Sequence, residues 1–186
     1  MPTLEFPELA DDVIRLRAWR DADADDQLAG LTDPLFVRHS DVPPLDRDKI
    51  IRRIAGLDRL REDGSAIYFA IVAANDDTEV LGEVSLSDLD GGTGRGSVGY
   101  WLLSAARGRG AATRAVRLLA GWAFTALGLA RLELTCGPDN PGSQRVALRS
   151  GFRQEGLLRS HQPFKGGRRD SLIFGLLPAD LAATAP

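Results

Sequence analysis

Residues 106–113 read ARGRGAAT, and this short stretch decides the fold that the sequence predicts. It follows an apolar, aromatic run at 98–103 (VGYWLL) and precedes a mostly apolar segment at 114–127 with the spacing of a buried helix. The first backbone amides of a helix have no partner within the helix, and with the helix dipole they form an anion site. Glycine allows the backbone to approach a ligand closely, and arginine adds positive charge. The stretch therefore predicts a turn that holds a phosphate group.

Two familiar phosphate-binding patterns do not fit this turn. The pattern GxxxxGK[ST] is absent from the chain, and the dinucleotide pattern GxGxx[GA] requires glycine or alanine where Thr113 stands. The dinucleotide pattern also needs a parallel strand–helix–strand unit at the first strand, whereas we expect three antiparallel strands before this turn. Taken alone, the turn is equally compatible with a plain surface loop whose arginines are solvated.

The surrounding hydrophobic pattern predicts strands and helices in mixed order. Alternating or short apolar runs predict strands at 13–19, 67–74, 80–89, 97–103, 130–136, 152–160 and 171–177. Helical spacing and start signals predict helices at 21–31, 46–61, 114–127 and 140–150. Asn140 and Pro141 have the residue types preferred at an N-cap and at the first helical position. We expect turns at 90–96 and 165–167 and a loose tail at 179–186.

Length and composition indicate one ordinary globular domain. The chain has 186 residues, of which 44% are hydrophobic and 26% charged. No apolar run approaches the length of a membrane span, and residues 1–12 lack the pattern of a signal peptide, so we expect a cytoplasmic protein without a membrane partner. Cys136 is the only cysteine, which excludes an internal disulfide. Two histidines and one cysteine, far apart in the sequence, predict no metal site.

Charge is distributed unevenly along the chain. Residues 1–90 contain 21 acidic and 10 basic residues, whereas residues 91–132 contain six arginines and no acidic residue. The basic segment is centred on the glycine-rich turn, which fits a polyanionic ligand. The acidic half either lines a site for a cationic substrate or forms a solvated face.

The segment 99–159 carries two patterns of a known family. The pattern [RQ]xxGx[GA] is matched by Arg107, Gly110 and Ala112. The pattern DNxxSxRVxxxxGF is matched by Asp139, Asn140, Ser143, Arg145, Val146, Gly151 and Phe152. With these two patterns at the proper spacing, the segment resembles the acyl-CoA-binding core of the GNAT acetyltransferases, and most of all their RimJ/RimL-like branch.

The resemblance implies a fold and a co-substrate. The fold would be a single α+β domain over residues 1–186, with a mixed, mostly antiparallel sheet that splays between its fourth and fifth strands and about four flanking helices. The co-substrate would be acetyl-CoA, without a metal. Its pyrophosphate would lie on the amides of Arg107, Gly108, Arg109, Gly110, Ala111, Ala112 and Thr113. Its pantetheine arm would contact Asn140 and run along Leu102, Leu103 and Ser104, where one amide would stabilise the oxyanion.

The resemblance also implies one catalytic residue. Acetylation of an amine requires a neutral amine, a stabilised oxyanion and a proton for the departing thiolate. In RimL-like enzymes a hydroxyl of the second pattern lies near the CoA sulfur, which assigns thiolate stabilisation to Ser143. A local helix cap is the alternative role for Ser143.

The general base is less clear from the sequence. RimL-like members place a glutamate after the GFxxEG segment, but the corresponding stretch here, LLRSHQPF, contains no carboxylate. His161 is one candidate because the ordinary pKa of histidine is near neutrality. Glu83 and Asp139 are two others. Tyr100, Trp101 and Cys136 are interpreted mainly as packing residues.

The sequence thus predicts an acetyl-CoA-dependent N-acetyltransferase that acts on a primary amine. The acceptor would be a protein N-terminus, a polyamine or an aminosugar such as an aminoglycoside, with a preference for cations if the acidic half lines the site. Two other classes stay open, a non-catalytic acyl-CoA-binding domain and, less well supported, a nucleic-acid-binding module that uses the arginines of 91–132. We expect no nucleic-acid partner and a monomer or homodimer.

Overall fold

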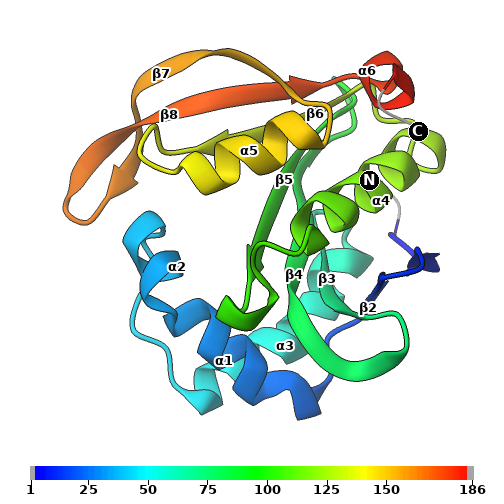
Figure 1. The fold of residues 1–186 in the computed structure, drawn as a ribbon, viewed down its shortest axis with the longest axis vertical. Helices are drawn as coiled ribbons and strands as arrows, with labels where there is room; N and C mark the ends of the chain where they lie inside the picture. Colours follow the sequence, from blue (N-terminus) through cyan, green and yellow to red (C-terminus); the bar gives the residue numbers. More distant parts are fainter. Residues whose placement is uncertain (1–2, 184–186) are drawn as a thin grey trace.

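The computed structural model describes residues 3–183 and has one eight-stranded sheet at its centre (Figure 1). The strands are β1 (Leu9–Ala10), β2 (Ile14–Arg17), β3 (Ile67–Ala73), β4 (Asp76–Asp90), β5 (Arg95–Leu102), β6 (Arg131–Cys136), β7 (Arg153–Phe164) and β8 (Gly167–Leu176). The α-helices of the described residues are α1 (Ala24–Thr32), α2 (Pro34–His39), α3 (Arg47–Glu62), α4 (Ala111–Thr125), α5 (Pro141–Arg149) and α6 (Pro178–Ala183). Two short 3-10 helices lie at Asp21–Asp23 and Ser104–Ala106.

The order of strands in the sheet is β1-β2-β3-β4-β5-β6-β8-β7. Neighbouring strands are antiparallel with one exception, the parallel pair of β5 and β6. The parallel pair is joined by α4, as a crossover between parallel strands requires. The predicted mixed, mostly antiparallel sheet is therefore confirmed.

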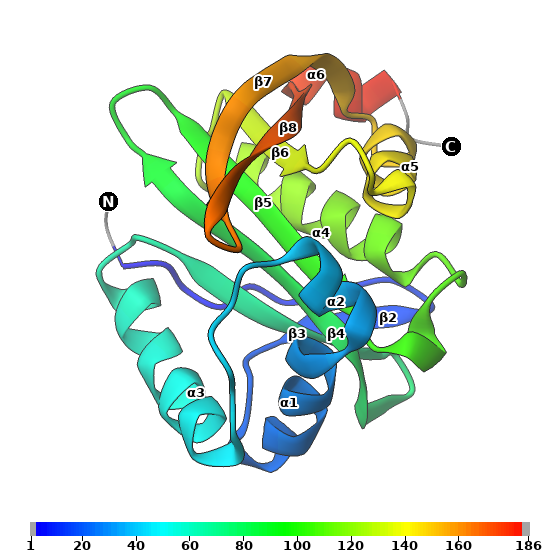
Figure 2. The same cartoon turned by 90° about the vertical axis from the view of Figure 1, so that its left-hand side faces the viewer.

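Helices cover both faces of the sheet because the buried strands are apolar on both sides. Along β3, Phe69 and Ile71 pack in the core cluster that includes α4, whereas Ala70 and Val72 pack in the cluster that includes α1 and α3. Figures 1 and 2 show the same division, with α1 and α3 on one side of the sheet and α4 on the other. Side chains that alternate along a strand therefore fill two separate cores.

The sheet splays open between β5 and β6. The two strands pair only from Arg95 to Ser97, opposite Arg131 to Glu133. Beyond Ser97, β5 continues to Leu102 along β4 and leaves its other edge without a strand partner. With 13–19 counted as the first strand, β5 and β6 are the predicted fourth and fifth strands, so the expected position of the splay is confirmed.

Three local predictions differ from the structure. Helix α4 begins at Ala111 rather than 114, so the small residues of the glycine-rich turn already form its first turn. Helix α2 was not predicted because it has six residues, too few to show a helical period, although Asp33 caps it. The prediction of a loose tail at 179–186 is wrong for 179–183, which lie in α6, where Leu181 packs on the core; residues 184–186 lie outside the described range. The described residues thus form six α-helices, where four were expected.

Candidate active site

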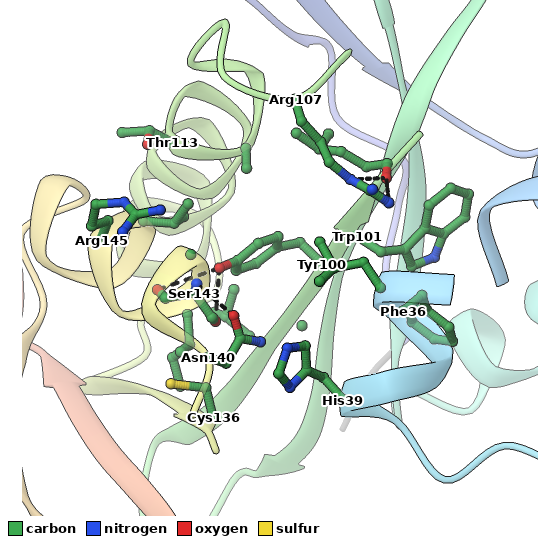
Figure 3. Close-up of a pocket in the computed structure, with 18 of the residues that line it drawn as sticks. Phe36, His39, Tyr100, Trp101, Arg107, Thr113, Cys136, Asn140, Ser143 and Arg145 are labelled. Carbon is green, nitrogen blue, oxygen red and sulfur yellow. Dashed lines mark hydrogen bonds between the residues drawn. The ribbon is translucent and has the colours of Figure 1, made fainter. Parts of the chain in front are cut away.

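A cavity of about 490 Å³ occupies the splay between β5 and β6. Its walls are the free edge of β5, the glycine-rich turn, the chain from β6 into α5, and the helix α2 (Figure 3). The side chains that reach it from α2 include Phe36 and His39. The splay therefore brings together residues from both halves of the chain.

The glycine-rich turn opens directly onto this cavity. Gly108 and Gly110 have φ of 76° and 85°, in the left-handed region that favours glycine. A Cβ added at either position would meet no atom within 4 Å, so the space in front of them is open. Gly110 is the N-cap of α4 and its carbonyl accepts the first helical bond from the amide of Arg114. The amides of Ala111, Ala112 and Thr113 are thus the ones that an α-helix leaves without helical partners.

Arg107 fastens the turn to the opposite half of the molecule. Its guanidinium donates hydrogen bonds to the carbonyl of Leu102 (2.9 Å from Nη2) and to the carboxylate of Asp33 (2.6 Å). Asp33 also accepts hydrogen bonds from the backbone amides of Leu35 and Phe36 at the start of α2. Burial would raise the pKa of Asp33, but these hydrogen bonds outweigh burial and lower it. Arg107 therefore positions α2 beside the cavity.

Asn140 and Ser143 lie at the start of α5, where they were expected. Oδ1 of Asn140 accepts a hydrogen bond from the amide of Ser143 (3.0 Å), which confirms that Asn140 is the N-cap. Oγ of Ser143 lies 2.8 Å from the hydroxyl of Tyr100, which comes from β5. Burial raises the pKa of Tyr100 to about 12, against a smaller opposite effect of the Ser143 hydrogen bond. Two hydroxyl groups thus meet in the cavity wall (Figure 3).

His39 stands on the opposite wall, at the end of α2. Its Nδ1 is buried without a hydrogen-bond partner and lies 3.7 Å from a carboxylate oxygen of Asp139. Arg169 of β8 holds both residues, since it donates to the backbone carbonyl of His39 (3.0 Å) and to Asp139 (2.7 Å). Burial lowers the pKa of His39, and the charge of Asp139 opposes this effect. His39 is therefore set to be neutral at neutral pH.

Comparisons with known proteins agree with this geometry. The acetyltransferase (GNAT) domain family matches residues 14–153. The chain is 31% identical over 170 residues to the N-acetyltransferase p20 of Bacillus licheniformis, over 91% of this chain and 95% of that protein. The chain belongs to the GNAT acetyltransferase family. Its splayed sheet and glycine-rich turn are the parts of the fold that form the cavity.

Two further relatives connect this GNAT acetyltransferase with ribosomal-protein acetyltransferases. It is 31% identical over 108 residues to the ribosomal-protein-serine acetyltransferase of Escherichia coli, over 58% of this chain and 59% of that protein. The structure of Mycobacterium smegmatis RimJ in complex with CoA-disulfide superimposes with a TM-score of 0.80 at 28% identity, over 90% of this chain and 83% of that chain. The predicted RimJ/RimL-like resemblance is confirmed.

Most of the predicted acyl-CoA-binding residues of this acetyltransferase line the cavity. The predicted residues that line it are Leu102, Arg107, Gly108, Gly110, Ala112, Thr113 and Asn140. Those that do not line it are Leu103, Ser104, Arg109 and Ala111. Ala111 is buried in the core beneath the turn, and the amide of Leu103 donates to the carbonyl of Leu81 (2.9 Å). Within the described part of the chain, no group of histidine, cysteine and carboxylate side chains could hold a metal ion.

The three predicted catalytic residues are not brought together. Ser143 lines the cavity, but His161 and Glu83 do not. His161 lies on β7, far along the hairpin with β8. Glu83 is buried on the face of α1 and α3, where it accepts hydrogen bonds from Arg53 (2.9 and 3.1 Å) and from Nε1 of Trp101 (3.2 Å). The carboxylate of Glu83 is therefore engaged in an ion pair with Arg53, away from the cavity.

Sequence reasoning missed the roles of Tyr100 and His39 in the cavity wall. Along β5, Tyr100 has the position of an ordinary packing residue. Its place in the strand pattern therefore does not show that its hydroxyl reaches Ser143 on α5. His39 lies in an unpredicted helix, and its neighbour Asp139 is distant in the sequence. Cys136 is in the core as predicted, but it also lines the cavity.

Proposed function

We propose that this acetyltransferase transfers the acetyl group of acetyl-CoA to a primary amine by direct attack of the amine on the thioester, and that the acceptor is a protein N-terminus. The observation that carries the first part is the positive-φ glycine turn, which opens onto the cavity of the splay. Acetyl-CoA would supply an activated acetyl group and a thiolate leaving group. The acceptor class rests on the similarity to ribosomal-protein acetyltransferases.

The residues around the turn match a polyanionic ligand. Helix α4 begins directly at Gly110, where an added Cβ would meet open space, and helix N-termini bind phosphate groups well. Arg145 and Arg149 of α5 line the same cavity, and Figure 3 shows Arg145 on the side of Thr113. A second recess, lined by Asp11, Arg114, Arg117 and Arg149, continues from Gly110 and Thr113, and within it Arg114 is paired with Asp11. Arg117, Arg145 and Arg149 would hold the phosphates of CoA, and the free edge of β5 would accept the pantetheine arm.

The hydroxyl pair would serve the leaving group. A phenol with a pKa of about 12 is protonated at neutral pH, so Tyr100 can donate a hydrogen bond to Oγ of Ser143. Ser143 can then donate its own proton toward a thiolate that develops beside it. Tyr100 thus supports Ser143 in stabilising the departing sulfur. A backbone amide on the free edge of β5 would stabilise the oxyanion.

The acidic residues just before and at the start of α1 do not line the cavity. Asp23 is buried and paired with Arg17 at 2.7 Å, and Asp25 pairs with Arg47 at the surface. No carboxylate is among the residues that line the cavity, whereas His39, Arg107, Arg145 and Arg149 are. Of the two roles that the sequence left open for the acidic half, attraction of a cationic acceptor therefore has no support from the positions of Asp23, Asp25 and Asp26.

Cofactor binding can be tested with two glycines that flank the same helix. Gly110 and Gly128 both have positive φ, at 85° and 65°, and an added Cβ would meet nothing within 4 Å at either. Only Gly110 lines the cavity.

We expect Gly110→Glu to weaken acetyl-CoA binding by more than about tenfold, or about 1.4 kcal/mol, because the new carboxylate would repel phosphates. Gly128→Glu should bind as the wild type does, and both variants should lose similar thermal stability. Calorimetric titration with acetyl-CoA measures the difference; equal affinities in the two variants would remove the turn as the phosphate site.

Catalysis is tested by thiol release with a panel of amines. N-terminal peptides of ribosomal proteins, polyamines and aminoglycosides should be compared at equal concentration, and we expect the peptides to be the best acceptors. Faster release with polyamines or aminoglycosides would identify a small-molecule acetyltransferase. Tight binding of acetyl-CoA without transfer to any amine would instead indicate a non-catalytic binding domain.

A further inference from the structure

Resting on the proposed function, we propose that His39 is the general base that removes a proton from the acceptor amine, and that Asp139 positions His39 and stabilises its charged form. The geometry that carries this assignment is the position of His39 on the α2 wall of the cavity and of Asp139 beside its Nδ1. The ring of His39 extends from α2 toward Asn140 (Figure 3).

His39 is the titratable group of the cavity suited to accept a proton. The other ionisable side chains that line it are Tyr100, Cys136, Arg107, Arg145 and Arg149. Arginine stays protonated in proteins, and burial raises the pKa of both Tyr100 and Cys136, so these groups keep their protons at neutral pH. The chain has only one other histidine, His161, and it does not line the cavity.

The surroundings of His39 hold a neutral imidazole that can be charged transiently. Burial and the positive charges of Arg38, Arg169 and Lys165 lower its pKa, and Asp139 raises it. Nδ1 faces Asp139, which leaves Nε2 as the ring nitrogen that can accept a proton from a substrate. When Nε2 is protonated, the carboxylate of Asp139 faces a full positive charge and stabilises it.

Several contacts fix this pair in place. Arg169 joins the backbone carbonyl of His39 to the carboxylate of Asp139, and Lys165 donates to the carbonyl of Val37 (2.7 Å). Gly137 leaves room for this link, since an added Cβ would lie 1.5 Å from Nη2 of Arg169. The tip of the β7–β8 hairpin therefore holds α2 against the cavity.

The proton balance of the reaction closes with these groups. The neutral amine nitrogen forms a bond with the thioester carbon and becomes positively charged. Nε2 of His39 takes one proton from that nitrogen, the carbon–sulfur bond breaks, and the thiolate receives a proton from Ser143. His39 then releases its proton to solvent and the hydroxyl pair regains one, which leaves amide and free thiol as products.

The test is the pH dependence of kcat/KM for the best peptide acceptor, measured in the wild type, His39→Gln, His161→Gln and Asp139→Asn. The wild type should show an acid limb with a pKa below that of an ordinary histidine. We expect His39→Gln to remove this limb and lower kcat/KM at neutral pH by about 100-fold, with unchanged acetyl-CoA affinity. Asp139→Asn should move the limb to lower pH, an effect that a purely structural role would not produce. His161→Gln should retain the limb.

Each contrary outcome is decisive. A limb that persists in His39→Gln, or is lost in His161→Gln, would overturn the assignment while acetyl transfer by the wild type leaves the proposed function intact. Absence of transfer by the wild type to every amine would overturn both proposals.

Discussion

At the scale of single residues, the phenol of Tyr100 is a partly buried hydroxyl group next to a serine. Its hydroxyl lies 2.8 Å from Oγ of Ser143, and burial raises its pKa to about 12. The phenol is therefore protonated over the whole pH range in which an acetyltransferase would work. The pair joins β5 to α5 across the open part of the splay, where the sheet itself provides no hydrogen bonds.

Replacing Tyr100 separates this role from packing. We expect Tyr100→Phe to lower kcat by about 100-fold, with little change of KM for acetyl-CoA, because the hydroxyl acts as charge develops on the sulfur. Tyr68→Phe is the matched control, since Tyr68 is the only other tyrosine and does not line the cavity. Steady-state kinetics of thiol release measure both variants. A rise of KM without loss of kcat would show that Tyr100 only shapes the binding site.

At the scale of elements, helix α1 packs unusually close to the sheet. Gly30 lies against the indole of Trp101, and a Cβ at this position would come within 1.9 Å of the ring. Trp101 in turn stacks on Trp19 and meets Phe36 edge to face. The glycine thus sets the distance of α1 from β5 and, through Phe36, the position of α2 on the cavity wall.

Alanine substitutions in two helices should have opposite effects. Gly30→Ala should lower the free energy of unfolding by about 2 kcal/mol because the core has no room for the methyl group. Gly56→Ala, at an exposed position of α3 with nothing within 4 Å, should raise the free energy of unfolding by about 0.8 kcal/mol because alanine favours helix. Urea denaturation of both variants gives the two values. Equal effects in the two helices would contradict the close contact of Gly30 with Trp101.

At the scale of the whole molecule, the uneven charge of the sequence is largely paired in the fold. Arginines of the basic segment bind carboxylates from other parts of the chain: Arg107 binds Asp33, Arg114 binds Asp11 and Asp12, and Arg131 binds Glu155. This pairing removes much of the free basic surface that nucleic acid would need. Among residues 3–183, no helix is long and apolar enough to cross a membrane.

Substitutions of two aspartates in the same acidic stretch distinguish a structural role from a role in acceptor binding. Asp23→Asn should lower the free energy of unfolding by about 3 kcal/mol, because it leaves the buried guanidinium of Arg17 without its charge partner. Asp25→Asn should change stability by less than about 0.5 kcal/mol, because its pair with Arg47 is exposed. Chemical denaturation measures both, and neither variant should raise KM for the acceptor. A salt-dependent rise of KM for the acceptor in Asp25→Asn would instead indicate that acidic residues attract a cationic acceptor.

The sequence by itself determined the elements whose signals are local. Glycines at positive φ, an Asn-Pro helix start and the alternation of apolar residues depend on backbone preferences and on burial of one face, so the turn, the cap of α5 and the strands β2 to β8 were predictable, whereas the two-residue strand β1 was not predicted. The two family patterns then predicted an acyl-CoA site in the splay, where the structure has a cavity. The short helix α2 carries too few residues for a period, and α6 depends on packing at the end of the chain.

Only the tertiary structure decided which side chains share the cavity. Tyr100 and Ser143 meet because β5 diverges from β6 and α5 covers the gap, and His39 meets Asp139 because Arg169 ties α2 to the turn before α5. The same packing directs Glu83 to Arg53 and leaves His161 outside the cavity wall. Such contacts join residues far apart in sequence, so they depend on the summed packing of several elements, and no local pattern records them.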